Sequence, residues 1–570
     1  MKTRKIILGI LLALSLRLTA LTAASPWTAV TPAPDNVQSM MLLSDGTVMA
    51  QDGTGTNWFR LTPDAKGHYF DGVWTTNDIK PMNYTRLYFA SDVLPNGKVF
   101  VAGAEDSGTN AATDGSPWVE IYDPVANTWT DYGPAPFGGM ADAESVVLNN
   151  GQVLVEPQAE TNNGYSTYIF NPSGGTWSAP ITPLNVQWES SWVKLPNDHI
   201  LTVDSGGQHA GAFTSEEFVP SSGAWTNASA APLPVSVWGY LPHDVAETGP
   251  AFLLPNGNAF FLGGSGHTAI YQFATSTWIP GPDIPGGQVA SDAPAAMMAN
   301  GKILTCVGPP LDASNSYDWT SPISFYEYDY SAGSIGAFTP VISPNTNYTS
   351  RAVTYICRML DLPDGTVLFT DSGSQLYVYQ PDSGPIATGR PAVDSVSWNS
   401  DGSLHLSGTL FNGISEGAAY GDDQQMATDF PIVSFTNSAG HVAYGRTYNW
   451  SSTSVQTGSR IVTTECAPPA GMLTQPGPFS LQVIANGNAS NPFTFNGPVW
   501  VDFNYTSALN YYFGTYEFPY DTLADGVAAV DSGGTIALNG NVQPSVSPET
   551  MTISKPMHII SVNGPSTIGR

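Results

Sequence analysis

One pattern recurs seven times along this chain and constrains its fold more than any other feature. Each copy is an apolar strand, a two-residue turn rich in Asn, Asp and Gly, and a second apolar strand. The copies read SMMLLSDGTVMAQDG, FASDVLPNGKVFVAG, AESVVLNNGQVLVEP, SSWVKLPNDHILTVDSGG, GPAFLLPNGNAFFLGG, APAAMMANGKILTCVG and RMLDLPDGTVLFTDSG. Repetition at a fixed period is the signature of a repeat architecture such as a β-propeller.

The turn dipeptides Asp-Gly, Asn-Gly and Asn-Asp supply the positive φ that a tight hairpin needs, so each copy predicts a β-hairpin. Four hairpins are followed by an aromatic residue with a Trp seven positions later. A third strand with an aromatic and a fourth strand headed by Trp complete a four-stranded blade, and a repeat of about 50 residues fits the kelch period. The four pairs are Tyr122 and Trp129, Phe170 and Trp177, Phe218 and Trp225, and Tyr271 and Trp278.

On these motifs the chain resembles the kelch-repeat superfamily, and more closely the galactose-oxidase-like β-propellers. The resemblance covers about residues 37–381 and implies seven blades. Blades one, six and seven lack the aromatic-to-Trp spacing, so their outer strands are the weakest part of the prediction. The segment 27–34, which precedes the first hairpin, is predicted to supply the outer strand that closes the ring with blade seven.

The rest of the chain predicts two further β-rich parts. Residues 385–498 follow a Pro-containing link and alternate in the manner of an immunoglobulin-like sandwich, which the resembled family carries in this position as an E-set domain. Residues 499–570 combine a short helix (520–530) with spaced strands and predict a short β-helix-like C-terminal module. The predicted fold class is all-β, with the propeller over 25–384.

The N-terminus and the charge of the chain indicate its environment. Basic residues, an apolar run of 11 residues and a small-residue patch predict a signal peptide over 1–24, so we expect a secreted protein, possible attachment to a cell surface, and no transmembrane segment in the mature chain. A formal net charge of −29 makes nucleic acid a poor partner. We expect a monomer.

The three cysteines, Cys306, Cys357 and Cys466, are too few and too scattered for a disulfide framework or a zinc site. A single bridge between Cys306 and Cys357, on neighbouring repeats, and three separate thiols are both compatible with the sequence.

The resemblance implies copper radical chemistry, with a Tyr crosslinked to a Cys, a second Tyr beside a His, and a further His from the sandwich. When positions are counted from the hairpin turns, Tyr88 aligns with the first Tyr and Tyr355 with the second. Three positions lack the expected Cys or His; they hold Val37-Gln38, Ile356 and Tyr420-Gly421-Asp422. Copper sites of this kind depend on nitrogen ligands, so we expect no copper and no other cofactor.

The same count from the hairpin turns predicts which residues begin the inner strands and surround the mouth of the central channel. They are Arg86, Tyr88, Asp142, Glu144, Trp188, Glu189, Glu247, Asp292, Tyr355 and Arg358. Only 11% of the chain is charged, so five carboxylates and two arginines at one end are a dense cluster.

Carboxylates, arginines and aromatic faces suit a sugar, because paired acids act as general acid and base, Arg binds carboxylates, and rings stack on pyranoses. Glu189, Glu247 and Tyr88 are assigned to catalysis, and the other seven residues to ligand binding. An acidic ring would also suit calcium. Alternatively, these acids simply accept hydrogen bonds from the amides of neighbouring blades.

Two classes of function follow. The first is a secreted propeller that binds an extracellular glycan or another cell-surface ligand at its acidic mouth. The second is an enzyme on the same scaffold: a carbohydrate-active hydrolase, lyase or epimerase that uses the mouth acids or, less favoured, a copper oxidase. The fold does not decide between them.

Overall fold

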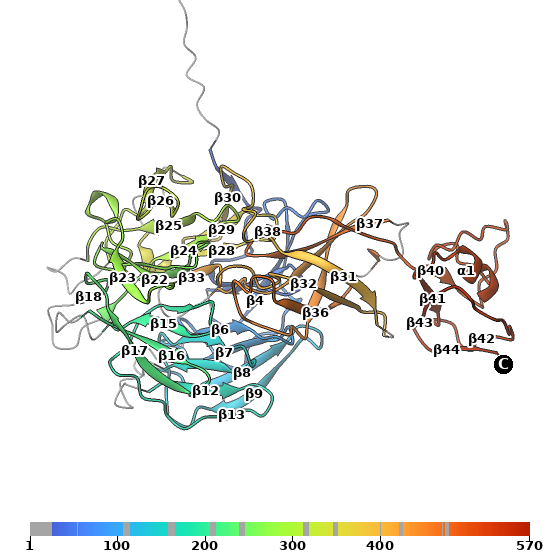
Figure 1. Cartoon of the computed structure of the whole chain (residues 1–570), viewed down its shortest axis with the longest axis horizontal. Coiled ribbons are helices and arrows are strands. Elements are labelled where there is room, and N and C mark those ends of the chain that lie inside the picture. The colour runs from blue at the N-terminus through green and yellow to red at the C-terminus, as the bar shows by residue number, and fades with distance from the viewer. Residues whose placement is uncertain are drawn as a thin grey trace, which may run out of the picture.

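The computed structural model describes residues 25–569, apart from short gaps. The gaps are residues 54, 107–114, 158–165, 206–212, 239–245, 312–318, 346–351, 400, 421–425, 470 and 473–477. The predicted signal peptide over 1–24 therefore lies outside the described residues. Seven antiparallel blades of four strands each form the larger body, and a fifth strand from the C-terminal region joins the sheet of blade six. The curled C-terminal sheet lies beside the propeller, and the last module projects at the far end (Figure 1).

The first four blades follow chain order from the centre outward. Blade one contains β2 (Val37–Leu42), β3 (Val48–Asp52), β4 (Trp58–Thr62) and β5 (Val73–Thr75), and blade two β6 (Ala90–Val93), β7 (Val99–Ala102), β8 (Trp118–Asp123) and β9 (Thr128–Pro134). Blade three contains β10 (Glu144–Val147), β11 (Val153–Glu156), β12 (Tyr168–Asn171) and β13 (Thr176–Trp177), and blade four β14 (Trp192–Lys194), β15 (Ile200–Val203), β16 (Thr214–Val219) and β17 (Ala224–Ala230).

A two-stranded sheet of β18 (Val237–Trp238) and β19 (Ala246–Glu247) precedes blade five. Blade five contains β20 (Ala251–Leu253), β21 (Ala259–Leu262), β22 (Thr268–Gln272) and β23 (Thr277–Pro280), and blade six β24 (Pro294–Met297), β25 (Ile303–Val307), β26 (Ser324–Asp329) and β27 (Ala337–Val341). Blade seven contains β28 (Arg358–Asp361), β29 (Val367–Thr370), β30 (Tyr377–Tyr379) and β1 (Trp27–Ala29).

The turn dipeptides do what the sequence predicts. All seven hairpins between the two innermost strands of a blade contain a residue with positive φ, between 66° at Asp198 and 86° at Gly257. The other five are Gly46, Gly97, Gly151, Gly301 and Gly365. Six of these residues are glycine, which enters this region without the Cβ clash, and the seventh is Asp198, a residue type that tolerates it; the sequence could therefore encode all seven turns locally.

The aromatic-to-Trp spacing also has a direct structural cause. Its members are directly opposed partners on the third and fourth strands, as in Tyr122 with Trp129 and Tyr271 with Trp278. Blades one, six and seven lack the spacing but still have a fourth strand. In blade seven that strand is β1, which pairs Trp27 with Tyr379, so the predicted closure of the ring by the N-terminal segment is confirmed.

The C-terminal region after the propeller is one curled antiparallel sheet. Its order is β31 (Ala392–Trp398), β32 (Leu404–Thr409), β36 (Ile461–Ala467), β35 (Val442–Tyr448), β34 (Ile432–Thr436), β37 (Phe479–Ala485) and β38 (Asn488–Ala489), and β39 (Phe493–Phe495) also pairs with β37. Leu406, Phe435 and Leu481 are buried in a common core inside the curl. An immunoglobulin-like topology for this region stays a prediction.

This curled sheet packs against the hairpin-turn end of the propeller. Thr447 N donates to Ser44 O at 3.1 Å, Trp450 N to Pro95 O at 3.1 Å, and Gln456 Nε2 to Leu254 O at 2.6 Å. The curled sheet therefore lies against the turn end, and the inner strands begin at the opposite end.

A segment of the same region enters the propeller. Strand β33 (Ala418–Tyr420) pairs with β24, the inner strand of blade six, and also contacts β20 and β28. We call residues 412–420 and 426–429 the channel segment, because they lie against the inner strands of several blades.

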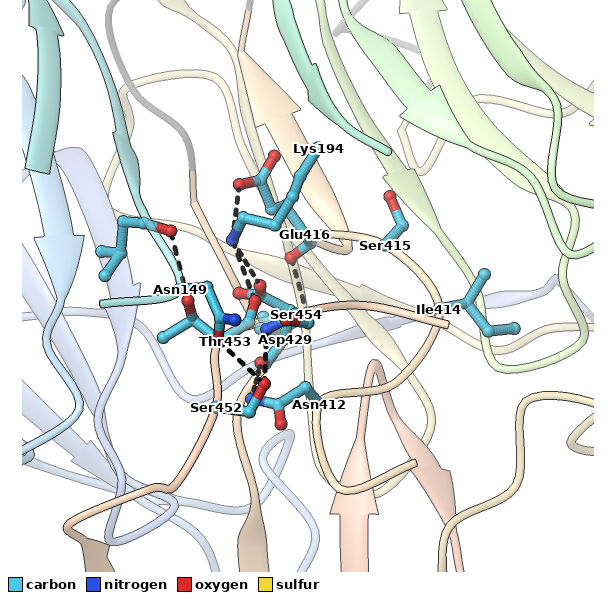
Figure 2. Close-up of polar contacts among 12 residues, drawn as sticks. Asn149, Lys194, Asn412, Ile414, Ser415, Glu416, Asp429, Ser452, Thr453 and Ser454 are labelled. Carbon is cyan, nitrogen blue, oxygen red and sulfur yellow. Dashed lines mark hydrogen bonds and ion pairs between the residues drawn. The ribbon is translucent and has the colours of Figure 1, made fainter. Parts of the chain in front are cut away.

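The channel segment is held by a buried ionic cluster (Figure 2). Lys194 Nζ, on β14, lies 3.4 Å from Glu416 Oε1 and 3.2 Å from Asp429 Oδ2, and its side chain is only 4% exposed. It also donates to Thr453 O at 3.2 Å, while Asn412 Nδ2 donates to Asp429 O at 2.9 Å. One cation therefore joins the propeller, the channel segment and the curled sheet.

The last module is built on parallel strands. Strands β40 (Val499–Val501), β41 (Thr535–Asn539) and β43 (His558–Val562) form one parallel sheet, and β42 (Ser545–Ser547) pairs in parallel with β44 (Ser566–Ile568). The predicted short helix is α1 (Leu523–Ala529), capped where Asp525 N donates to Thr522 Oγ1 at 3.1 Å. This arrangement is the β-helix-like module that the sequence predicts. Within the described part of the chain, no helix has the length and apolar character needed to cross a bilayer.

Candidate functional site

The mouth of the propeller is marked by unusual backbone geometry. Tyr88, Asp142, Glu189 and Asp292 each lie two or three residues before an inner strand, in blades two, three, four and six. All four have positive φ, at 51°, 38°, 51° and 51°. Side chains with a Cβ adopt this region at a cost of about 1–3 kcal/mol, and such residues concentrate at binding and active sites. The repeat therefore places a strained, partly exposed side chain at the same position in four blades.

Hydrogen bonds between blades fix this geometry. Thr248 N donates to Glu189 O at 3.1 Å, and Thr248 O in turn accepts from Asp292 N at 3.3 Å. Thr354 Oγ1 donates to Ser291 O at 2.8 Å. Blades four to seven are thus linked directly through the residues that begin their inner strands, which holds the mouth rigid.

Aromatic rings gather on one side of the mouth. The rings of Tyr88 and Tyr355 have centroids 6.4 Å apart, and Trp319 lies 5.1 Å from Tyr355. Beneath them, Arg358 Cζ lies 5.7 Å from the Tyr88 ring and 3.7 Å from the Tyr420 ring. These are cation–π distances, so the buried guanidinium orients the two tyrosines.

Asp292 is a carboxyl group at this mouth with a raised pKa. Burial raises its pKa from 3.8 to about 7, Arg358 opposes the rise, and Glu105 adds to it. A carboxyl group with a pKa of about 7 exchanges a proton near neutral pH, so it is able both to donate and to accept hydrogen bonds.

Two predicted mouth residues are not at the mouth, and the prediction for them is wrong. Arg86 is 0% exposed. Its Nη1 donates to Gly103 O at 2.6 Å and Trp118 O at 2.8 Å, and its Nη2 lies 3.0 Å from Glu120 Oε2. Gly103 follows β7, and Trp118 and Glu120 lie on β8, the third strand of the same blade; position relative to the hairpin turn does not encode this pairing.

Glu144 is the second such residue. It is 1% exposed, and its Oε1 accepts a hydrogen bond from Trp192 N of the next blade at 2.7 Å. This is the structural alternative foreseen for the mouth acids: a carboxylate that satisfies a neighbouring amide. Glu144 joins blades three and four.

The other predicted residues divide by exposure. Tyr88, Asp142, Trp188, Glu189, Asp292 and Tyr355 are partly exposed, whereas Arg358 is buried. The side chain of Glu247 lies outside the described residues. The structure brings Tyr88, Asp292, Tyr355 and Arg358 together; Asp142, Trp188 and Glu189 occupy the corresponding positions in their own blades.

Two residues of this site were not predicted from their position relative to the hairpin turns. Trp319 lies in the connection between β25 and β26, where the repeat spacing fails, and no sequence signal identifies it. Glu105 follows β7 and reaches the site because Glu105 N donates to Tyr88 O at 3.0 Å.

The mouth does not fit the copper centre that the resemblance implies. The positions of the missing Cys and His hold Val37, which is buried, Gln38, which accepts from Ser372 Oγ at 3.2 Å, and Ile356. Tyr420 reaches the site from the channel segment, as the alignment of the sandwich predicted, but its ring lies on a guanidinium. The donor set lacks imidazole and a cation occupies that side, so no reaction step is derived through copper.

No group of three or more His, Cys, Asp or Glu side chains in the described ranges is arranged to hold a metal ion. Cys306 and Cys357 are buried beside each other in blades six and seven, and Cys466 is buried in the curled sheet. All three are free thiols.

Comparison with known proteins agrees with the repeat. An F-box/kelch-repeat protein of Arabidopsis thaliana is 25% identical over 188 residues, which is 33% of this chain and 46% of that protein. The fold is a kelch-type β-propeller. The match spans less than half the length of this relative, and no family model matches the chain.

Two solved structures match the chain at low sequence identity. A fungal alcohol oxidase of the AA5 family, in complex with copper, is 12% identical with a TM-score of 0.43, and the match covers 83% of this chain and 98% of that one. YjhT is 13% identical with a TM-score of 0.35, and covers 54% of this chain and 99% of that one.

Proposed function

We propose that this kelch propeller is secreted and binds a carbohydrate, presented by an extracellular or cell-surface ligand, at the mouth opposite the curled sheet. The observation that carries the proposal is the convergence of Tyr88, Tyr355 and Trp319 beside Asp292. Ligand sites in proteins combine apolar and aromatic walls with a few fixed polar groups, and aromatic faces beside carboxyl oxygens match the apolar faces and hydroxyl groups of a pyranose.

The arrangement also supports binding because contacts within the chain fix it. The left-handed backbone at Tyr88 and Asp292, and the guanidinium of Arg358 under the ring of Tyr88, hold these groups in place. A preorganised site avoids part of the ordering cost that binding otherwise incurs.

A glycan array probed with the full-length protein, followed by titration calorimetry with a bound glycan, tests the proposal. Tyr355→Ala and Asp292→Asn are expected to weaken binding about tenfold or more, because each removes a stacking face or a hydrogen-bonding group at the site. Asp283→Asn is the matched control, since this carboxylate is on the surface of blade five, paired with His267.

Array binding that survives both mouth substitutions unchanged would reject the mouth as the site. Failure to bind any glycan, with the fold intact, would reject carbohydrate as the ligand class. Glu189→Gln then tests whether the mouth acids of blades four and six act together.

A further inference from the structure

The parallel stack of the C-terminal module is closed at one side and open at the other. On the closed side, β40 is covered by a following segment: Trp500 N donates to Gly514 O at 2.9 Å, Tyr520 N to Trp500 O at 3.0 Å, and Asp502 N to Tyr520 O at 2.8 Å. Strand β41 pairs with β40, and β43 pairs with β41. Beyond β43, none of the described residues continues the sheet.

The backbone of β43 presents a regular edge on that open side. His558 N donates to Gly534 O at 2.9 Å and Val562 O accepts from Gly540 N at 2.8 Å, so these residues point toward β41. Successive residues of a strand direct their N–H and C=O groups to opposite sides. The amide and carbonyl groups of Ile559 and Ser561 therefore face the open edge.

Side chains repeat from level to level as they would in a stack that continues. Asn539 Nδ2 donates to Asp502 Oδ2 at 3.0 Å, and Asn563 Nδ2 donates to Asn539 Oδ1 at 3.1 Å. The hydroxyls of Ser545 and Ser566 are 2.9 Å apart in the same way. Such ladders stabilise stacked parallel strands, and here they reach the level of β43 and β44.

The apolar side chains at this level are only partly covered by the described residues. Ile559 lies in register with Ile536, but Ile536 is 0% exposed whereas Ile559 is 36% exposed. On β44, Ile568 is 40% exposed. Edge strands of soluble proteins are usually blunted by Lys, Pro or a bulge, and β43 and β44 contain none of these.

The charge at this tip favours a second copy of the same chain. The chain has a net charge of −29, yet residues 550–569 contain Lys555 and no Asp or Glu. The module lies at the end of the molecule far from the propeller (Figure 1). Two copies that meet at their tips therefore keep their acidic propellers apart.

We propose that the open edge of β43 pairs with β43 of a second copy, which makes the protein a dimer rather than the monomer expected from its sequence. A twofold axis that continues the sheet makes the two strands antiparallel. With β43 centred on Ile560, the edge groups of Ile559 pair with those of Ser561 of the partner subunit. The column formed by Trp500, Ala537 and Ile560 then continues across the axis.

Sedimentation velocity of the full-length protein over a range of concentrations tests the proposal. The wild type is expected to show twice the monomer mass, with stronger association at high salt as repulsion is screened. Ile559→Lys and Ser561→Pro are expected to weaken association about tenfold or more, because the first adds a charge to the edge and the second removes an outward N–H.

Leu509→Lys is the matched control: Leu509 is also exposed, but it belongs to the segment that follows β40 on the closed side, and its substitution should leave association unchanged. Hydrogen exchange of the wild type gives a second readout, because the amides of Ile559 and Ser561 should be protected only at concentrations where the dimer forms. A wild type that stays monomeric, equal effects of all three substitutions, or concentration-independent exchange at β43 would each overturn the proposal.

Discussion

Replacing Lys194 by Met is expected to destabilise the joint between the propeller and the channel segment, and to do so more at high pH. Burial by itself lowers the pKa of Lys194, but Asp429 and Glu416 outweigh it and raise that pKa, so the ammonium stays charged. Its removal leaves two buried carboxyl groups without their cation. Breaking a buried ion pair in this way costs about 3–5 kcal/mol when the remaining charges cannot be neutralised.

At pH 5 the remaining carboxyl groups can take up protons, because burial already raises the pKa of Glu416 to about 7 and also raises that of Asp429. The loss should therefore be clearly smaller at pH 5 than at pH 8.

Urea unfolding at both pH values measures the change in the free energy of unfolding. Lys98→Met is the control, because Lys98 is 41% exposed and its 2.9 Å ion pair with Asp123 should contribute no more than about 1 kcal/mol. A second variant, Lys194→Met combined with Glu416→Gln, should recover part of the loss, since it removes one of the two unpaired charges. Equal losses at pH 5 and pH 8, or a loss no larger than that of the control, would refute the reasoning.

Three further predictions follow from the packing. The wild type should lose thermal stability between about pH 4 and pH 8, because burial raises the pKa of Asp92 from 3.8 to about 8. Over this range the native state keeps the proton that the unfolded chain has lost, so the free energy of unfolding falls as pH rises. A calorimetric melting temperature that rises over this range would contradict the prediction. Gly97→Ala should lower the free energy of unfolding by about 1–2 kcal/mol, since Gly97 has φ +77° and a Cβ there would meet Thr447 O at 3.0 Å. Gly223→Ala is the control: a Cβ at Gly223 would meet no atom within 4 Å, so its loss in urea unfolding should be smaller. Trp27→Ala should lower the free energy of unfolding by about 3–5 kcal/mol, because the buried indole of Trp27 packs on three aromatic side chains where β1 closes the propeller. A smaller loss would show that β1 is dispensable.

The candidate site was only partly predictable, and particular residues show why. Tyr88, Asp292 and Tyr355 lie two or three residues before inner strands, and the seven turns locate that region along the chain. Arg86 and Glu144 fall in the same region but are buried, because Glu120 and the amide of Trp192 lie within reach in space. Trp319 lies in a connection with no repeat register, so its place beside Tyr355 could not be read from spacing.

The sequence by itself determined the propeller, because its signals are local: each turn dipeptide sets its own φ, and each hairpin alternates over a few residues. It also determined that the N-terminal segment closes the ring, since blade seven lacked an outer strand of its own. Tertiary structure decided which polar residues face the mouth and which join blades, and it decided the passage of the channel segment to Lys194 and Arg358. Those outcomes depend on pairing between residues as far apart as Lys194 and Asp429, and no local pattern carries that information.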